Sequence, residues 1–273
     1  MLIAFASDYG LADEFVGVCK AVMLGLAPDV RILDLSHDIP AHDVRAGSLL
    51  LVRAVQYLPD ETILVAVVDP GVGTARRLVA VEVAGGMLLG PDNGLLAPAV
   101  AMAGGARTVV SLDEPEYRLP APGPTFAGRD ILAAAAGHLA AGVPLSDLGT
   151  PLDPGTLVPG LVSLPEVRPD GSIAGEVWWV DRFGNCQLNI DPTELGREGA
   201  YPGARLEVHL AGDIRAARVV HTYSDAKPSE LVLMVDSYGL LALALDRESA
   251  AAALGLRAGS SVTLVPEGAG PAG

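Results

Sequence analysis

Cysteines and long apolar runs are scarce in this sequence, and their scarcity excludes several kinds of protein. The 273 residues contain two cysteines, Cys19 and Cys186, and neither lies in a CxxC or other metal-ligand spacing. Both have apolar neighbours, so we interpret them as buried thiols rather than zinc ligands. No run of about 18 uncharged apolar residues is present, which argues against a membrane-spanning helix. The N-terminal apolar run is too short for a signal peptide, so we expect a cytoplasmic protein.

Aromatic and basic residues are also few. Aromatic residues make up 4% of the chain, so its 50% hydrophobic content is carried mainly by Ala, Gly, Leu and Val. With 18 Lys and Arg against 33 Asp and Glu, the formal net charge is −15. Nucleic acids and anionic membranes are bound through clustered positive charge, so neither is expected as a partner. A small cationic substrate is compatible with this acidity.

Strands and helices alternate over the first half of the chain. Each predicted strand is a short apolar run, and each predicted helix repeats apolar residues at intervals of three and four. The predicted strands are Leu2–Ser7, Arg31–Leu35, Ile63–Val68, Leu78–Val83, Met87–Leu89 and Thr108–Leu112; the predicted helices are Asp13–Leu26, one capped by Asp43 and ended by Pro59, Leu95–Ala103 and Gly128–Gly142. This alternation predicts an α/β domain with a largely parallel, doubly wound sheet.

The second half has a β pattern. Six prolines fall within residues 143–170, which indicates a linker or a wrapping segment. Turn residues then separate the apolar runs Glu176–Val180, Arg205–His209, Ala216–His221, Glu230–Val235, Leu240–Leu245 and Ser261–Val265. This spacing predicts a small barrel or sandwich. We therefore divide the chain into an N-terminal α/β domain of residues 1–160 and a C-terminal β-barrel domain of residues 161–273, with a disordered tail from Gly268.

The segment Val67–Arg77, VVDPGVGTARR, is the first candidate for chemistry. A buried strand ends there in Asp69, and Arg76 and Arg77 follow a short glycine-rich turn. In open α/β sheets, ligands bind at the carboxyl ends of strands. Asp69 with a nearby guanidinium is therefore a candidate catalytic pair. A structural salt bridge that holds the turn explains the same residues equally well.

Two other strands also end in polar groups. Asp8 follows the first, and Ser36-His37-Asp38 follows the second, which predicts an acidic cleft. The sequence has no GxGxxG after the first strand and no GxxxxGK[ST], so a nucleotide phosphate site is not expected. His37 and His42 could ligate a metal with neighbouring carboxylates, but loop histidines more often have hydrogen-bonding or capping roles. We therefore predict no metal.

A further polar cluster, Asp181-Arg182-Phe183-Gly184-Asn185, follows a strand that contains two tryptophans. These side chains suit a heteroaromatic ligand: the ring stacks, the amide reads an edge and the carboxylate binds an ammonium group. An ordinary β-turn is an equally good explanation. Ser237-Tyr238-Gly239 lies between two apolar strands and is more simply explained as a turn.

Seven segments occur in the order found in the S-adenosyl-L-methionine (SAM) hydroxide adenosyltransferases, and the chain resembles that family. They read SDYGLADEFVG, ILDLSHDIPAHDVRAG, VVDPGVGTARR, GPDNGLL, TFAGRDILAAAA, VDRFGNCQLNI and VDSYGLLALAL, over about residues 2–265. The family, also called adenosylmethionine hydrolase, is related to the fluorinase and chlorinase. The resemblance implies an α/β domain, a β-barrel and a homotrimer that binds its ligand between subunits. It also implies hydrolysis of SAM to adenosine and L-methionine without a metal or cofactor.

The resemblance implies roles for individual residues by their motif positions. Asp69 would orient or deprotonate the attacking water, and Arg76 would pair with Asp69 and favour its ionised form. The implied substrate contacts are Asp8 for the ribose diol, Asp13 and Asp181 for the methionine ammonium, Phe126 for the pocket wall, Phe183 and Asn185 for adenine, and Ser237 for the methionine carboxylate. Tyr238 stands where the halogenases carry an arginine.

Ala127 departs from the family pattern. Hydroxide-transferring members read TFHGRD, and their histidine completes an Asp–Arg–His set around the water, whereas this chain reads TFAGRD. Alanine can neither donate a hydrogen bond nor transfer a proton. A natural variant with altered water handling and an engineered substitution both explain it. His37 is an alternative source of the missing imidazole.

Three functions follow from these features. The first is SAM hydrolysis, slowed by Ala127. The second is halogenation, which Asp69 disfavours because a carboxylate repels a halide and the halogenases have an uncharged residue there. The third is a catalytically weak SAM- or adenosine-binding protein, for which Ala127 is the only support.

Overall fold

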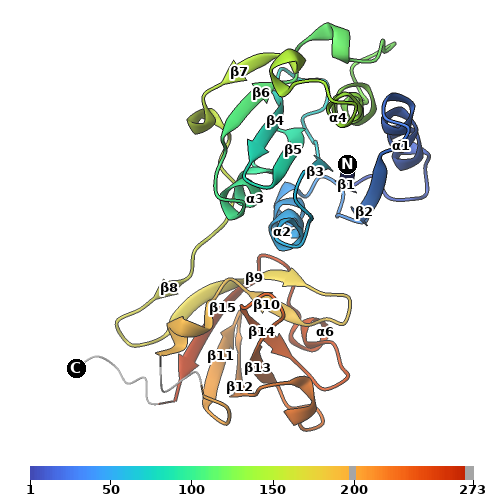
Figure 1. The fold of residues 1–273 in the computed structure, drawn as a ribbon. Coiled ribbons are helices and arrows are strands. Elements are labelled where there is room, and N and C mark those ends of the chain that lie inside the picture. The colour runs from blue at the N-terminus through green and yellow to red at the C-terminus, as the bar shows by residue number, and fades with distance from the viewer. Residues whose placement is uncertain (197–200, 268–273) are drawn as a thin grey trace. The chain divides into compact units, whose positions relative to one another are not determined.

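The computed structural model describes residues 1–196 and 201–267. It divides into two compact units, Met1–Val162 and Ser163–Gly273, whose elements are labelled in Figure 1. The predicted disordered tail from Gly268 lies outside the described residues. The α/β class with a C-terminal barrel is confirmed.

The N-terminal unit is built on a seven-stranded sheet in the order β2-β1-β3-β5-β4-β6-β7. Its strands are β1 (Leu2–Ser7), β2 (Arg31–Ser36), β3 (Thr62–Val67), β4 (Leu78–Val83), β5 (Gly86–Pro91), β6 (Thr108–Ser111) and β7 (Thr150–Leu152). The pairings β2–β1, β1–β3 and β3–β5 are parallel, as expected, whereas β5–β4, β4–β6 and β6–β7 are antiparallel. The difference arises because only two residues join β4 to β5, and a parallel pair needs a long crossover.

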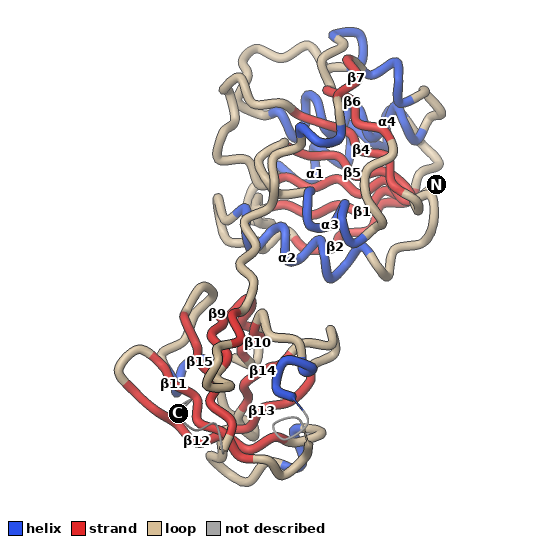
Figure 2. Tube along the Cα trace, turned by 90° about the vertical axis from the view of Figure 1, so that its left-hand side faces the viewer, coloured by secondary structure: helices blue, strands red, loops and turns tan. Residues whose placement is uncertain are grey.

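Helices cover both faces of this sheet (Figures 1 and 2). They are α1 (Phe15–Leu26), α2 (Val44–Val55), α3 (Ala97–Met102) and α4 (Ala134–Ala140). Alternate residues of β1 and β3 share a buried core with α1 and α4, as a period of two along a strand requires. The Asp43 side chain caps α2 by accepting the Ala46 backbone N–H at 2.8 Å, as predicted. The predicted helix over 128–142 begins instead as a π-helix, Gly128–Ala133.

The C-terminal unit is a closed seven-stranded barrel with one appended strand. The sheet order is β10-β14-β13-β12-β11-β15-β9-β8, and β10 also pairs with β9, which closes the barrel. The strands are β8 (Glu166–Val167), β9 (Ile173–Val180), β10 (Cys186–Leu188), β11 (Arg205–Leu210), β12 (Asp213–Val219), β13 (Val232–Val235), β14 (Leu241–Ala244) and β15 (Ser261–Pro266). The sequence pattern missed β8, β10 and the five-residue helix α6 (Ala250–Leu254), because segments this short carry little periodicity.

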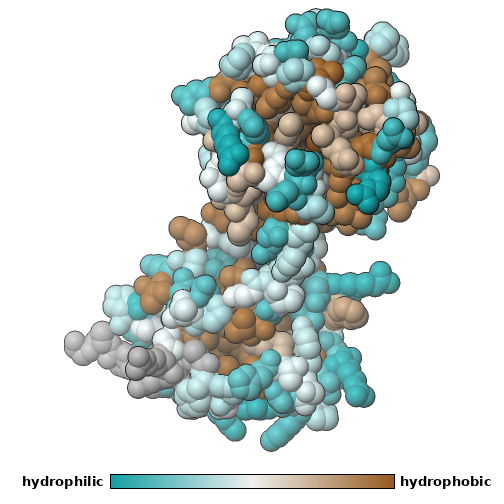
Figure 3. Space-filling model, viewed as in Figure 1, coloured by the Kyte–Doolittle hydropathy of each residue, from teal (hydrophilic) through white to brown (hydrophobic). Residues whose placement is uncertain are grey.

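Both units keep apolar side chains at their surfaces. Figure 3 shows them gathered over the middle of the visible face of the N-terminal unit. The exposed large apolar side chains include Leu11, Phe15 and Leu33 in the N-terminal unit, and Phe183 and Val235 in the barrel. Both cysteines are buried, and burial raises the pKa of each thiol to about 12. Among the described helices, none has the length and apolar character needed to cross a membrane.

Candidate functional site

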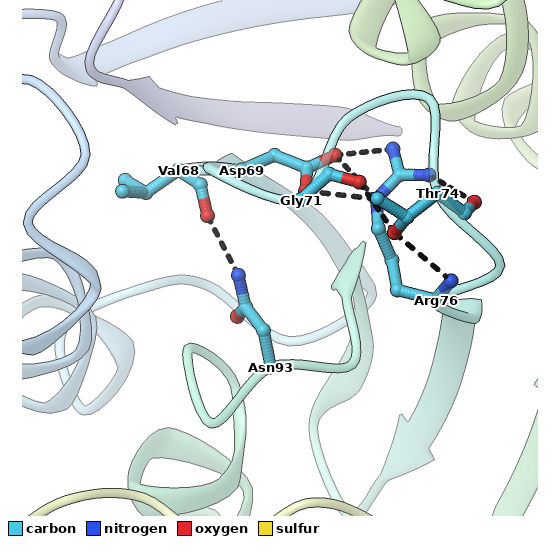
Figure 4. A network of polar contacts seen from close by, with 6 residues as sticks. All are labelled: Val68, Asp69, Gly71, Thr74, Arg76 and Asn93. Atoms are coloured by element: carbon cyan, nitrogen blue, oxygen red, sulfur yellow. Dashed lines mark hydrogen bonds and ion pairs between the residues drawn. The ribbon is translucent and has the colours of Figure 1, made fainter.

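Asp69 and Arg76 form a closely fitted ion pair directly after β3. The guanidinium Nε lies 2.8 Å from Oδ1 and 2.9 Å from Oδ2 of Asp69, and Nη2 also donates to Oδ2 (Figure 4). Only 6% of the Asp69 side chain and 15% of the Arg76 side chain are exposed. A guanidinium bound to both carboxylate oxygens fixes their orientation. The structure therefore confirms the salt bridge, which also orients the carboxylate, while the catalytic role of the pair stays a prediction.

The turn around this pair is fixed from both sides. Thr74 Oγ1 donates to the Gly71 carbonyl at 2.7 Å, and a Cβ at Gly71 would lie 3.1 Å from the Arg76 side chain. Asn93 donates from Nδ2 to the Val68 carbonyl at 2.9 Å, one residue before Asp69. Figure 4 shows Asn93 reaching this strand end from the segment after β5. The carboxylate is therefore attached to a rigid backbone, which a catalytic group requires.

Asp69 lines a pocket of about 400 Å³ in the N-terminal unit. The predicted residues Asp8 and Phe126 line the same pocket, which also contains Tyr9, Phe15, Ala41, His42, Val67, Val72, Thr125 and Gly128. Asp8 reaches it because β1 and β3 are neighbours whose carboxyl ends meet at one sheet edge. Of the three strand ends predicted to form one acidic cleft, those of Asp8 and Asp69 share this pocket, whereas Ser36, His37 and Asp38 do not line it. The volume is within the range typical of small-molecule sites.

Three aromatic rings form one wall of this pocket. Tyr9, Phe15 and Phe126 contact one another with centroid separations of 5.2–5.7 Å, in the tilted and edge-on arrangements that aromatic pairs prefer. Burial, with added contributions from Cys19 and the carboxylates of Asp8 and Asp69, raises the pKa of Tyr9, so its phenol stays neutral. Aromatic faces beside two carboxylates provide a favourable environment for an organic cation.

Ala127 lies on the other side of the ion pair. It does not line the pocket that contains Asp69 but a second cavity of about 580 Å³, which Arg76 also lines. Phe126 lines the 400 Å³ pocket and Ala127 lines the 580 Å³ cavity, so the backbone at these two residues separates the two cavities. Ala127 is nearly buried, at 6% exposure. A longer side chain at position 127 would therefore face the cavity that Arg76 also lines.

His37 does not substitute for the missing imidazole in this pocket. It is buried and contacts Ser7 and Asp34, and it is absent from the residues that line either cavity around the ion pair. His42 does line the first pocket, and its backbone N–H donates to Asp8 Oδ2 at 2.9 Å. Neither histidine belongs to a group of three potential metal ligands, and the described residues contain no such group. The absence of a metal stays a prediction.

In the barrel, Asp181, Phe183 and Asn185 form one compact turn between β9 and β10. Asp181 Oδ1 accepts the backbone N–H groups of Phe183 and Asn185, both at 2.9 Å, and its Oδ2 accepts from Asn185 Nδ2 at 2.8 Å. Gly184 has a φ of +85°, and a Cβ there would lie 2.0 Å from Ser249 Oγ. Phe183 is left 77% exposed. The turn thus displays an aromatic ring on a rigid support, while Asp181 is largely used for structure.

The other predicted contacts lie on loops. Asp13 precedes α1 on an exposed bend and lines neither cavity around the ion pair. Ser237 and Tyr238 lie in the turn between β13 and β14, where Asp236 Oδ1 accepts the Tyr238 backbone N–H at 2.8 Å. This bears out the interpretation of Ser237–Gly239 as a turn. Sequence reasoning missed Tyr9, Phe15 and His42 as pocket residues, although all three lie within segments that carry the family resemblance.

Comparison with known proteins is consistent with this arrangement. Residues 3–149 match the family model of the SAM hydroxide adenosyltransferase N-terminal domain, and residues 175–263 match that of the C-terminal domain. The chain belongs to the SAM hydroxide adenosyltransferase family. The two matched regions correspond to the two compact units, so the membership covers both the α/β unit and the barrel.

Similar proteins of known name include both SAM hydrolases and fluorinases. A protein of Salinispora tropica named (R)-S-adenosyl-L-methionine hydrolase is 44% identical over 94% of this chain and 95% of its own. A protein of the same name from Thermus thermophilus is 38% identical over 96% of this chain and 99% of its own. A fluorinase of Nocardia brasiliensis is 32% identical, over 96% and 95%. The solved structure of an uncharacterised conserved protein from Thermotoga maritima is 30% identical with a TM-score of 0.89, over 96% and 99%.

Proposed function

We propose that this chain hydrolyses SAM to adenosine and L-methionine by attack of water at C5′ of the ribose, without a metal or cofactor. The observation that carries the proposal is that Asp69, held at both carboxylate oxygens by Arg76, lines an acidic, aromatic pocket. The names of relatives at 38–44% identity support the same reaction. The carboxylate also favours water over a halide as the nucleophile.

The chemistry requires little beyond an oriented nucleophile. A C5′–O bond forms while the C5′–S bond breaks, and its electron pair returns to sulfur, which leaves as a neutral thioether. The water loses a proton, which Asp69 accepts and passes to solvent. Because the leaving group needs no protonation, catalysis depends on holding water in line with the C–S bond at about 3–3.5 Å from carbon and on removing its proton. Among the described residues, Asp69 Oδ1 accepts a hydrogen bond from Arg76 Nε alone, which leaves it a lone pair for that water.

Substrate contacts are proposed from both units. In the N-terminal pocket, Asp8 accepts hydrogen bonds from the ribose diol and Phe126 forms the wall. From the exposed bend before α1, outside that pocket, Asp13 contacts the methionine ammonium. From the barrel, Phe183 and Asn185 bind adenine, Asp181 uses its remaining acceptor capacity for the ammonium group, and Ser237, beside Tyr238, binds the methionine carboxylate. The exposure of Phe183 supports its availability to a ligand.

We further propose that the active form is a cytoplasmic homotrimer, in which each ligand lies between the N-terminal unit of one subunit and the barrel of its neighbour. Exposed apolar side chains on both units support an interface. The net charge of −15 supports the absence of nucleic acid and of anionic membrane among the partners.

Product analysis tests the reaction directly. The protein is incubated with SAM, with and without chloride or fluoride, and adenosine, 5′-halo-adenosine and methionine are followed by chromatography. Equal amounts of adenosine and methionine, independent of halide, are expected. A halide-dependent nucleoside would identify a halogenase instead, and tight SAM binding without products would identify a binding protein.

Subunit mixing tests the shared site. Asp69→Asn and Phe183→Ala disable different units, so each homo-oligomer is expected to be weakly active. When the two variants are coexpressed in equal amounts, about a quarter of the sites combine an intact N-terminal unit with an intact barrel, and activity recovers to about that fraction of wild type. Coexpression of Asp69→Asn with Asp8→Ala, which lie in the same unit, is the control and recovers none. No recovery in the first mixture would show that each site is built within one chain.

A further inference from the structure

Ser7, His37 and Asp34 form a hydrogen-bonded series of side chains that is buried at Ser7 and His37 and begins one residue before the pocket residue Asp8. Ser7 Oγ lies 2.7 Å from His37 Nδ1, and His37 Nε2 lies 3.1 Å from Asp34 Oδ1. The ring of Phe5 contacts the imidazole edge-on at 4.7 Å. Ser7 is fully buried and His37 is 4% exposed, whereas the Asp34 side chain is 43% exposed and pairs with Lys20.

These are the residue types of a catalytic triad, but their placement excludes nucleophilic catalysis. A nucleophilic serine must reach the substrate, and Ser7 is the innermost member and lines neither cavity around the Asp69–Arg76 pair. Only the carboxylate, at the opposite end, contacts solvent. The three hydrogen-bonded side chains therefore have a structural role and stabilise the conformation of the residues around them.

The hydrogen bonds to Asp34 and Ser7 determine the tautomer of His37. Partial burial opposes ionisation of Asp34, but hydrogen bonds from Lys20 and His37 prevail and lower its pKa, so this carboxylate only accepts. His37 Nε2 must then carry a proton and donate it, and in the neutral ring Nδ1 accepts from the Ser7 hydroxyl. Ser7 Oγ in turn accepts the Tyr9 backbone N–H at 3.4 Å.

The segment from His37 to His42 holds the segment from Ser7 to Gly10 at three points. The first is the Ser7–His37 side-chain bond. The second is the Gly10 backbone N–H, which donates to the His37 carbonyl at 2.8 Å. The third is the His42 backbone N–H, which donates to Asp8 Oδ2 at 2.9 Å. His42 adopts a φ of +68°, which is uncommon for a residue other than glycine. Such a conformation persists only where the surrounding structure determines it.

We infer that His37 is a positioning residue, which holds the Ser7–Gly10 segment so that the Asp8 carboxylate and the Tyr9 ring face the ligand in the 400 Å³ pocket. The inference rests on the proposed function for its ligand, the ribose of an adenosyl group. His37 makes no contact with the reacting atoms. Its loss weakens ground-state and transition-state binding alike, so it raises KM and leaves kcat nearly unchanged.

Two amide substitutions separate the two bonds of the imidazole. In His37→Asn, the amide oxygen takes the place of Nδ1 and still accepts from Ser7. In His37→Gln, the amide takes the place of Nε2 and still reaches Asp34, but the bond to Ser7 is lost. We expect KM for SAM to rise roughly tenfold in His37→Gln, the effect of losing about one buried hydrogen bond, and to stay within about twofold of wild type in His37→Asn. Ser7→Ala should match His37→Gln, and the double variant should be no worse than either.

Hydrogen exchange gives a readout that needs no substrate. The Gly10 and His42 amides should exchange roughly tenfold faster in His37→Gln than in wild type, and at nearly the wild-type rate in His37→Asn. If the wild type does not hydrolyse SAM, the proposed function fails, while exchange still decides whether His37 holds the segment. Unchanged exchange in His37→Gln would overturn the inference. So would faster exchange with unchanged KM, a fall in kcat alone, or equal losses in the Asn and Gln variants.

Discussion

Asp69→Asn is expected to lower kcat for SAM hydrolysis by about 10²–10⁴-fold, the range typical of a lost general base. The substitution preserves size but removes the charge, and it places an amide against the donors of Arg76. Steady-state kinetics with adenosine detection measures the effect, and thermal unfolding checks that the fold is retained.

The sulfonium charge of SAM allows this experiment to distinguish two roles of Asp69, binding the cation and acting on water. SAM loses its positive charge as the C5′–S bond breaks, so a carboxylate that only attracts the cation favours the ground state and lowers KM without raising kcat. Asp8→Asn is the matched control, because Asp8 is the other carboxylate of the pocket and its amide oxygen can still accept from His42. Asp8→Asn should mainly raise KM. If Asp69→Asn also raised KM and spared kcat, Asp69 would bind the cation and would not act on water.

Ala127→His is expected to raise kcat by tenfold or more, since a positioned acid–base group contributes about 10²–10⁴-fold. The 580 Å³ cavity that Ala127 and Arg76 both line has room for an imidazole. The pH–rate profile of the variant should acquire a new limb near pH 6.5, the ordinary range of histidine.

Ala127→Phe provides the control, because it adds a ring without nitrogens and should not raise kcat. In the double variant Asp69→Asn/Ala127→His the gain should disappear, since the imidazole, placed in the cavity that Arg76 lines, is expected to act on the water through the Asp69–Arg76 pair. An Ala127→His enzyme with wild-type kcat and an unchanged pH profile would show that position 127 does not limit turnover.

The sequence located most elements of the N-terminal unit within one or two residues, because its strands are continuous apolar runs and Asp43 marks a helix start. It did not predict the antiparallel half of the sheet. Apolar content shows that a strand is buried but does not identify its neighbours, and the direction of β4 is set by its two-residue connection to β5. Short strands such as β10 were missed because three residues carry no measurable period.

The sequence predicted those residues of the candidate site that lie at the end of a strand. Asp8 and Asp69 each come at the end of a predicted strand, so their meeting at one sheet edge follows from strand alternation. Tyr9, Phe15 and His42 were not predictable as pocket residues, because their contacts join segments whose loop conformations have no sequence period.

By itself, the sequence determined the acidic, aromatic-poor character of the chain, its α/β-then-β order and, through motif order, its family resemblance. These are properties of composition and local spacing, which need no knowledge of distant contacts. Only the tertiary structure decided that Arg76 binds both oxygens of Asp69, that Ala127 faces a different cavity from Asp69, and that His37 lies buried against Ser7. Such features depend on side-chain direction and on packing between segments far apart in the chain, which the order of residues does not express.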